Sequence, residues 1–273
     1  MSKPALAFIG GGNMATSLVG GLLEQGYPSS RITVSDPMAE NRDRLQQKFG
    51  INITSDNLAT ARNADVIVLA VKPQMMKQVA QELAPAIAHH PMIISIAAGI
   101  PLAALQQWLG QDTPIVRCMP NTPALVQTGA AGLFANNHVS AEQKSSATEI
   151  LTAVGISCWL DKEADIDAVT AVSGSGPAYY FLIMEAMEQV GMELGLSQAV
   201  SRQLTLQTAL GASKMAMESD VEPAELRRRV TSPGGTTQRA IETFIESDIT
   251  ELFRKAMTGA VERAEEMARE ISD

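Results

Sequence analysis

The first 160 residues alternate short runs of apolar, β-branched residues with longer segments of helical length. The apolar runs are nearly continuous, as they are in strands that helices cover on both faces. This alternation predicts a mainly parallel, doubly wound sheet. The predicted strands are Ala5–Ile9, Ile32–Val34, Ala64–Val71, Met92–Ala97 and Pro114–Cys118, and the predicted helices are Asn13–Gln25, Met38–Phe49, Gln74–Ala88 and Leu102–Leu109.

After about Asp161 the strand-like runs end, and long stretches rich in Ala, Met, Leu, Glu and Gln follow. These stretches predict an all-helical second domain, whose first long helix carries a glycine-rich interruption. The fold class is therefore α/β, with an N-terminal Rossmann-type doubly wound sheet followed by a helical C-terminal domain. We expect the domains to be residues 1–160 and 161–273, and a length of 273 residues also favours two domains.

The charge balance and the rare residue types exclude several functional classes. The chain has 21 basic and 30 acidic residues, a net charge of −9 and no long basic stripe, so no nucleic-acid partner is expected. Its two cysteines, Cys118 and Cys158, exclude a disulfide framework, and we expect both thiols to be buried. With only three histidines, no metal site is expected.

We expect neither a signal peptide nor a membrane span. Two long stretches without a formal charge, residues 83–111 and 168–184, are both interrupted by proline and glycine. The N-terminal apolar run, residues 5–10, is too short for the apolar core of a signal peptide. The sequence therefore predicts a cytoplasmic protein.

A glycine-rich turn with the pattern G-x-G-x-x-A joins the first predicted strand to the first predicted helix. Gly10 allows the tight turn, Gly12 lets a pyrophosphate approach the backbone, and the small Ala15 lets helix and strand pack closely. The helix N-terminus presents unpaired N–H groups and a positive dipole end to the phosphates. The motif predicts dinucleotide binding, and a purely structural turn is the alternative.

Asp36 follows the second predicted strand, about 20 residues past the glycines. An acidic residue at this place hydrogen-bonds the ribose 2′-hydroxyl of NAD and repels the 2′-phosphate of NADP. Because Pro37 follows it, Asp36 is equally well placed to cap a helix. Arg42 and Arg44 either reach a 2′-phosphate or lie in solvent, so the choice between NADH and NADPH stays open.

Two further segments follow predicted strands, where ligands bind in a doubly wound sheet. Lys72 is placed to meet a phosphate or a carboxylate, and a surface lysine at a helix start is the alternative. The small residues Ala97, Ala98 and Gly99 either leave room for a planar ring or serve packing.

In the helical half, Pro233, Gly234 and Gly235 predict a turn whose successive N–H groups converge into an anion-binding nest. Thr236 and Thr237 add hydroxyls at the start of the following helix, where the dipole also favours an anion. This arrangement suits a small carboxylate, and a glycine turn that caps a helix is the alternative.

Several segments, taken in order and with their spacing, resemble those of pyrroline-5-carboxylate reductases. The resemblance runs from residue 6 to about residue 265, and its most specific parts are MPNTP and SPGGTT. The segments are FIGGGNM at 8–14, AVKP at 70–73, SIAAG at 95–99, MPNTP at 119–123, VSGSGPAY at 172–179 and SPGGTT at 232–237.

The resemblance implies reduction of the cyclic imine 1-pyrroline-5-carboxylate to L-proline by NADPH or NADH, the last step of proline biosynthesis. It also implies a Rossmann domain and a helical dimerisation domain that interlocks with a second subunit, giving a homodimer or a higher homo-oligomer. Where the family often has a serine that touches a 2′-phosphate, this chain has Asp36. With Ala15 and Asp36 from the glycine and acidic motifs, the expected coenzyme contacts are Gly10, Gly11, Gly12, Asn13, Met14, Ala15, Asp36, Asn57, Ala70, Val71, Lys72, Pro73, Ala97, Ala98 and Gly99.

The family's substrate pocket maps onto Gly235, Thr236 and Thr237, and we also expect Asn121 and Ser175 to contact the substrate. Hydride transfer demands little from side chains, because the coenzyme supplies the hydride and the protein supplies orientation. A hydrogen-bonded or protonated nitrogen makes the imine a good acceptor. We therefore expect the Thr237 hydroxyl to be the catalytic donor, with an already protonated imine as the alternative.

Two other functions compete with this interpretation. A 3-hydroxyacid-type dehydrogenase has a similar plan but needs a lysine base on the long helix after the glycine-rich segment, and residues 163–213 contain no lysine. A non-catalytic nucleotide-binding protein would keep the fold without turnover. The intact segment 232–237 argues against that second alternative.

Overall fold

The computed structural model describes residues 3–272 of the chain, with side chains described from residue 3 to residue 270. These residues form two compact units. The first consists of residues 3–175 together with 260–272, and the second is Gly176–Gly259. Helix α12 (Ile249–Ser272) contributes to both units. The division into 1–160 and 161–273 stays a prediction. It marks where the sequence changes from strand-like to helical, whereas the two units are defined by contacts within the structure.

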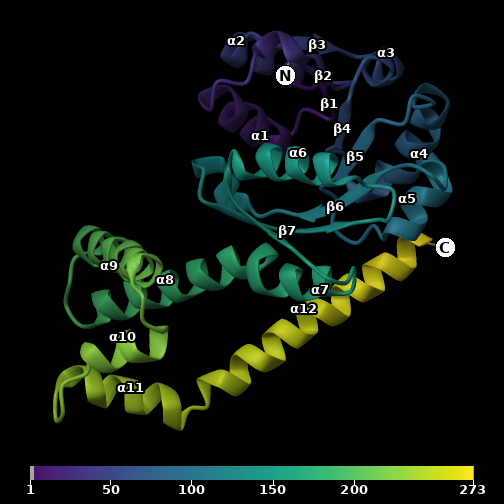
Figure 1. Ribbon diagram of the computed structural model, residues 1–273. Helices are drawn as coiled ribbons and strands as arrows, with labels where there is room; N and C mark the ends of the chain where they lie inside the picture. Colours follow the sequence, from purple (N-terminus) through teal and green to yellow (C-terminus); the bar gives the residue numbers. More distant parts are fainter. Residues whose placement is uncertain (1–2, 273) are drawn as a thin grey trace. The chain divides into compact units, whose positions relative to one another are not determined.

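The first unit is built on an eight-stranded sheet with the order β3-β2-β1-β4-β5-β6-β7-β8 (Figure 1). Neighbouring strands are parallel except for β6 and β7, which are antiparallel. The chain runs outward from β1 to β3 and then crosses to β4, so the strand order reverses between β1 and β4. The strands are β1 (Leu6–Ile9), β2 (Ile32–Ser35), β3 (Asn52–Thr54), β4 (Val66–Leu69), β5 (Met92–Ser95), β6 (Ile115–Met119), β7 (Gly129–Ala135) and β8 (Gly155–Trp159).

Helices cover both faces of this sheet, as the nearly continuous apolar strands predict. Leu6 and Phe8 of β1 join a core cluster with α1, α2 and α6, whereas Ala7 and Ile9 join a second cluster with α3, α4 and α5. Successive side chains of a strand point to opposite faces, so one apolar strand serves both cores. These helices are α1 (Asn13–Glu24), α2 (Ala39–Phe49), α3 (Asn57–Arg62), α4 (Pro73–Leu83), α5 (Leu102–Leu109) and α6 (Ala141–Thr152).

The strand register brings four loops to one edge of the sheet. Ile9 of β1 pairs with Ser35 of β2 and with Leu69 of β4, and Leu69 pairs with Ser95 of β5. The four strands therefore end level with one another. The loops that leave this edge begin at Gly10, Asp36, Ala70 and Ile96.

Three strands, β3, β7 and β8, are not among those predicted from the sequence. The sequence of β7, GAAGLFA, is rich in glycine and alanine, which have low strand propensity. Packing explains one of its glycines, because a Cβ at Gly132 would lie 2.7 Å from Cγ2 of Val169. The glycine at position 132 therefore follows from a contact distant in sequence.

The prediction that both cysteines are buried is wrong for one of them. Cys118 lies in β6 and is buried, whereas Cys158 lies in the edge strand β8 and is exposed. Burial raises the pKa of the Cys118 thiol far above its usual value, so this thiol stays protonated.

The glycine-rich interruption of the first long helix is a π-helix rather than a break. It spans Thr170–Gly174 and lies between α7 (Asp165–Val169) and α8 (Gly176–Glu193). The Ser175 N–H donates to the carbonyl oxygen of Thr170 at 2.8 Å, the five-residue spacing of a π-turn. Turns of this kind are frequent at functional sites.

The second unit consists of helices α8, α9 (Gln198–Glu218), α10 (Pro223–Arg229) and α11 (Thr236–Glu246) with the first part of α12. The Ser201 hydroxyl of α9 donates to the carbonyl oxygen of Glu188 at 2.8 Å and joins α8 to α9. Among the described residues of α8, only Gly176 is buried, although the helix is rich in apolar residues. This unit therefore leaves most of its apolar side chains uncovered in a single chain.

Across residues 3–272, no helix combines the length and the apolar character needed to cross a membrane. Over the same span, no three His, Cys, Asp or Glu side chains are grouped so that they could hold a metal ion.

Candidate active site

The turn after β1 brings two strand ends into close contact. Gly10 has a φ of +105°, where a side chain is strained, and a Cβ there would lie 2.6 Å from the carbonyl oxygen of Ala70. The Gly10 N–H donates to the carbonyl oxygen of Ser35 at 2.7 Å. A glycine at this position therefore lets the chain leave β1 between β2 and β4, where the strand order reverses.

Helix α1 begins directly after this turn with an open N-terminus. Within the described residues, no side chain caps this helix, and its first turn contains no acidic residue. A Cβ at its N-cap, Gly12, would meet no described atom within 4 Å. The N–H groups of Asn13, Met14 and Ala15 have no intrahelical partner, and the helix dipole favours an anion here. These residues fit the diphosphate of a dinucleotide.

Asp36 lies at the end of β2 and is buried, with 6% of its surface exposed. Its Oδ2 accepts from the Gly11 N–H at 2.7 Å, and its Oδ1 accepts from the Met38 N–H at 2.8 Å. Helix α2 begins at Ala39 with Met38 as its N-cap, so the alternative in which Asp36 caps this helix is wrong. The carboxylate is instead held against the glycine turn.

Two arginines of α2 also lie beside this turn. Arg44 Nη2 donates to the carbonyl oxygen of Gly11 at 3.0 Å, and Arg42 Nη1 donates to the carbonyl oxygen of Asp36 at 2.7 Å. In the part of the chain that the structure describes, neither arginine forms a salt bridge with the Asp36 carboxylate. Asn41 Nδ2 also donates to Asp36 Oδ2 at 3.2 Å, so neutral donors hold this carboxylate beside the Gly11 turn.

The other expected coenzyme residues follow β4 and β5 or lie beside β2. Lys72 is exposed and is the N-cap of α4, and Pro73 is the first residue of that helix. Asn57 begins α3, and its Oδ1 accepts a hydrogen bond from the Ser35 hydroxyl. The structure thus gathers the following expected coenzyme residues at one edge of the first unit: Gly10, Gly11, Gly12, Asn13, Met14, Ala15, Asp36, Asn57, Ala70, Val71, Lys72, Pro73, Ala97, Ala98 and Gly99.

An ionic cluster around the buried Arg117 in the same unit is absent from the sequence-based predictions. Arg117 of β6 forms a 2.9 Å salt bridge with Glu163 and lies 3.8 Å from Asp167. Burial raises the pKa of the Asp167 carboxyl, and Arg117 partly opposes that shift. The signal that could have found the cluster is a single arginine inside an otherwise apolar strand, IVRCM.

Both the nitrogen and the oxygen of the Asn121 side-chain amide form hydrogen bonds within the protein. Its Nδ2 donates to the carbonyl oxygen of Ser173 at 3.0 Å, and its Oδ1 accepts from the Ala130 N–H at 2.8 Å. Asn121 therefore ties the MPNTP segment to the π-helix and to β7. Ser175, which is half-buried, follows the π-helix directly. The expected substrate contacts of Asn121 and Ser175 stay predictions.

The predicted anion nest differs from the turn seen in the second unit. The Gly235 N–H donates to the carbonyl oxygen of Ser232 at 3.0 Å, and the Gly234 N–H donates to Oε1 of Gln238 at 2.6 Å. These amides are therefore used within the turn, contrary to the prediction that they converge on a ligand. Within the described chain, α11 has no side-chain cap, so the N–H groups and exposed hydroxyls of Thr236 and Thr237 are better placed for an anion.

Two family models match the chain in the regions described above. The model described as pyrroline-5-carboxylate reductase dimerisation matches residues 163–267. The model described as NADP oxidoreductase, coenzyme F420-dependent, matches residues 5–99, which include the glycine turn, Asp36 and the loops after β4 and β5.

Two relatives that match over nearly the full length of the chain are named pyrroline-5-carboxylate reductase. A pyrroline-5-carboxylate reductase of Pseudomonas aeruginosa is 56% identical over 271 residues, covering 99% of this chain and 99% of the relative. The chain belongs to the pyrroline-5-carboxylate reductase family. Another member, from Vibrio alginolyticus, is 44% identical and covers 98% of this chain and 99% of the relative.

Solved structures agree with this family assignment. A pyrroline-5-carboxylate reductase from Coxiella burnetii has a TM-score of 0.95 and 45% identity, covering 97% of this chain and 99% of the other. A pyrroline carboxylate reductase from Plasmodium falciparum, solved with NADP bound, has a TM-score of 0.87 and 31% identity, covering 98% and 99%. As a pyrroline-5-carboxylate reductase family member, the protein is an NAD(P)-dependent oxidoreductase with a Rossmann-type sheet and a helical dimerisation domain.

Substitution of two neighbouring glycines separates folding from coenzyme binding. Gly12→Ala adds a methyl group to open space at the start of α1, so we expect an unchanged melting temperature and a coenzyme dissociation constant raised by about tenfold or more. Gly10→Ala adds a methyl group against the carbonyl oxygen of Ala70, at a φ that strains any side chain. We therefore expect the free energy of unfolding to fall by about 1–3 kcal/mol. Thermal melts and NADPH fluorescence titrations measure both effects. Wild-type coenzyme affinity in Gly12→Ala would contradict the assignment.

Removal of the Asp36 charge should move the coenzyme preference toward NADPH. Two unit charges about 4 Å apart interact by about 1–4 kcal/mol, depending on exposure, so Asp36→Ser should raise the NADPH-to-NADH ratio of kcat/KM by about tenfold. The control is Asp43→Ser, which removes an exposed acidic charge from the neighbouring helix α2. An equal shift of the ratio in both variants would show that Asp36 has no specific role.

Proposed function

We propose that this protein reduces 1-pyrroline-5-carboxylate to L-proline with NADPH or NADH, as the last step of proline biosynthesis. The observation that carries the proposal is its full-length similarity to named reductases, 56% identity over 271 residues in one case. The open N-terminus of α1 at the strand-order reversal supports the same activity, because it fits the diphosphate of the coenzyme.

The proposed coenzyme site uses mostly backbone. The N–H groups at the start of α1 hold the diphosphate, and Asp36 accepts a hydrogen bond from a ribose hydroxyl. The loop with Ala97, Ala98 and Gly99 accepts the planar ring, since its side chains are small. When bound, the reduced coenzyme supplies the hydride.

The proposed substrate residues hold the carboxylate and activate the ring nitrogen. The exposed N–H groups at the start of α11 suit a carboxylate, which the helix dipole also favours. The Thr237 hydroxyl donates a hydrogen bond to the imine nitrogen, which raises the electrophilicity of the adjacent carbon. Asn121 and Ser175 complete the proposed set. This chemistry explains why the site needs no strong acid and no histidine.

The purified protein should oxidise NADPH or NADH only when 1-pyrroline-5-carboxylate is present, as followed by absorbance with both coenzymes side by side. Thr237→Ala should lower kcat by about tenfold or more, because a positioned proton donor is lost, while the coenzyme dissociation constant stays unchanged. The control is Thr243→Ala in the same helix, whose hydroxyl donates to the carbonyl oxygen of Arg239. No turnover by the wild-type protein would refute the activity, and a wild-type kcat in Thr237→Ala would refute the role of Thr237.

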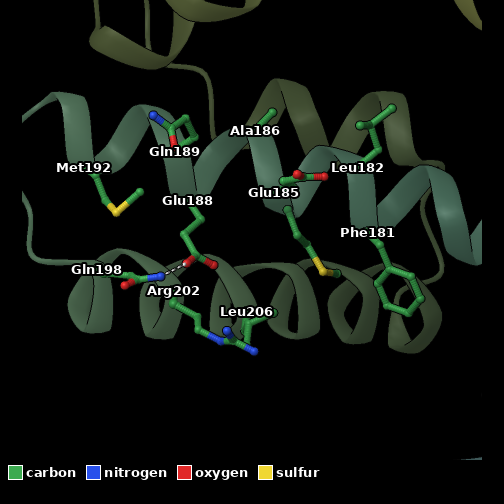
Figure 2. Close-up of a pocket in the computed structure, with 11 residues that line it drawn as sticks. Phe181, Leu182, Glu185, Ala186, Glu188, Gln189, Met192, Gln198, Arg202 and Leu206 are labelled. Atoms are coloured by element: carbon green, nitrogen blue, oxygen red, sulfur yellow. Dashed lines mark hydrogen bonds between the residues drawn. The ribbon is translucent and has the colours of Figure 1, made fainter.

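The protein is also proposed to be a homodimer or a higher homo-oligomer. A groove of about 620 Å³ lies between α8 and α9, and Figure 2 shows its apolar and polar lining. Gln198 and Glu188 form a hydrogen bond across it at 3.5 Å. Nearby Phe181 is 63% exposed and Leu210 62%, and apolar helices of this kind are normally buried. A second copy of the chain is the proposed cover, because residues 163–267 match a dimerisation family.

Light scattering after size-exclusion chromatography should give at least twice the chain mass of 29.1 kDa. Leu210→Glu should lower the mass toward that of one chain, since the exposed side chain contributes to a dimer interface rather than to the core of the monomer. Gln81→Glu adds the same charge to an exposed position of α4 in the first unit and should leave the mass unchanged. A monomeric wild-type protein would contradict the proposed assembly.

The cytoplasm is the proposed location of this reductase, because its two cysteines, Cys118 and Cys158, are both free, as is usual in a reducing compartment. The net charge of −9 supports the absence of a nucleic-acid partner.

A further inference from the structure

Arg117 is a charged residue in the interior of the sheet. It lies in the middle of β6, pairs with Ser95 of β5 and Phe134 of β7, and its side chain is only 6% exposed. Its Nε–H has no hydrogen-bond partner within the described residues. A buried cation destabilises a fold unless anions compensate it, so its partners indicate what it does.

The first partner, Glu163, connects Arg117 to the loop after β5. Glu163 Oε1 accepts from Arg117 Nη1 at 2.9 Å and from the Leu102 N–H at 2.7 Å. Leu102 is the first residue of α5, which within the described chain has no side-chain cap from its N-cap Pro101. Glu163 therefore caps α5 from a distance of 61 residues along the chain.

The loop after β5 is held at both ends. Its start lies beside β6, the strand of Arg117, and its end is bonded to Glu163. The loop starts after Ser95, which pairs with Arg117 in the sheet, and it ends at Leu102, which is bonded to Glu163. Between these ends lie Ala97, Ala98 and Gly99. Gly99 has a φ of +71°, so the loop holds a conformation that ordinary residues rarely adopt.

The second partner connects Arg117 to the proposed substrate side of the same unit. Asp167 Oδ1 lies 3.8 Å from Arg117 Nη2, and Asp167 belongs to α7, which leads into the π-helix Thr170–Gly174. Ser175 follows that π-helix. One guanidinium thus lies between two carboxylates that hold two separate segments of the first unit.

We propose that Arg117 and Glu163 are positioning residues for hydride transfer, which fix the Ala97–Gly99 loop against the ring of the coenzyme. The inference rests on the proposed function, because it assigns that loop to the coenzyme. Neither residue acts as an acid or a base. Asp167 is the second partner of Arg117 and connects β6 to α7, the helix that leads into the π-helix.

The test compares Glu163→Gln with Glu163→Ala in the full-length protein. Glutamine keeps an oxygen for the Leu102 N–H but loses the charge opposite Arg117, whereas alanine loses both. We expect Glu163→Ala to raise the dissociation constants of NADPH and NADH by about tenfold and to lower kcat, with a smaller effect in Glu163→Gln. The KM for 1-pyrroline-5-carboxylate should change by less than about twofold in both variants.

The matched control is Asp65→Asn. Asp65 Oδ2 accepts from the Ala5 N–H at 2.7 Å and lies 3.6 Å from Arg31 Nη2, at the opposite, amino-terminal edge of the strands. It therefore has the same kind of backbone and arginine contacts without touching the loop. Coenzyme binding should be unchanged in this variant even if its melting temperature falls.

Hydrogen exchange supplies a readout that needs no turnover. Without coenzyme, the amide of Leu102 should exchange faster in Glu163→Ala than in the wild type or in Asp65→Asn. Arg117→Lys should retain more coenzyme affinity than Arg117→Met, because it keeps the charge. If Arg117→Met does not fold, the Glu163 variants decide.

Unchanged coenzyme dissociation constants in a folded Glu163→Ala variant would overturn the proposal. The proposal would also be overturned if Asp65→Asn lost coenzyme affinity in the same proportion to its fall in melting temperature as Glu163→Ala. That result would show a purely structural role. The two outcomes that would overturn the proposal are read from coenzyme binding and melting temperature, without turnover. They remain decisive even if the wild-type protein does not reduce the imine, which would refute the proposed function separately.

Discussion

The contact between Gly10 and the carbonyl oxygen of Ala70 is the constraint on which the first unit depends. The chain leaves β1 so close to β4 that a Cβ at Gly10 would lie only 2.6 Å from that oxygen. Helix α1 then begins three residues later, at Asn13. Because β1, β2, β4 and β5 end level, the same edge receives Asp36 and the loops after β4 and β5. The proposed anion site at the start of α1 is made largely of backbone, so its side chains can vary as long as the close approach at Gly10 is kept.

Much of this edge could be predicted from the sequence, because its signals are local. The glycine pattern, the apolar runs and Asp36 each occur within a few residues, and the predicted doubly wound sheet is confirmed. Contacts distant in sequence account for what could not be predicted. Gly132 in β7 follows from packing against Val169, and Glu163 caps a helix that begins 61 residues earlier. Local patterns carry no information about such partners.

The turn at 232–237 shows a different limit of sequence reasoning. Its glycines correctly predict a turn before a helix, yet the side chain of Gln238 takes the Gly234 N–H that was assigned to a ligand. The second unit shows the same limit on a larger scale. Its Met- and Leu-rich helices have the composition of a core, whereas side chains such as Phe181 are 63% exposed in the single chain. Composition identifies what must be covered, but not by which molecule.

Helix α12 has a consequence for the order in which the protein is made. Its last part, residues 260–272, belongs to the first unit, where Ala264 is buried and a Cβ at Gly99 would lie 3.4 Å from that of Met267. Nascent chains generally fold from the N-terminus as they emerge from the ribosome. The Rossmann sheet can therefore assemble early, but the segment that covers Gly99 is translated only after the second unit. The first unit is therefore complete only after the whole second unit, Gly176–Gly259, has been translated.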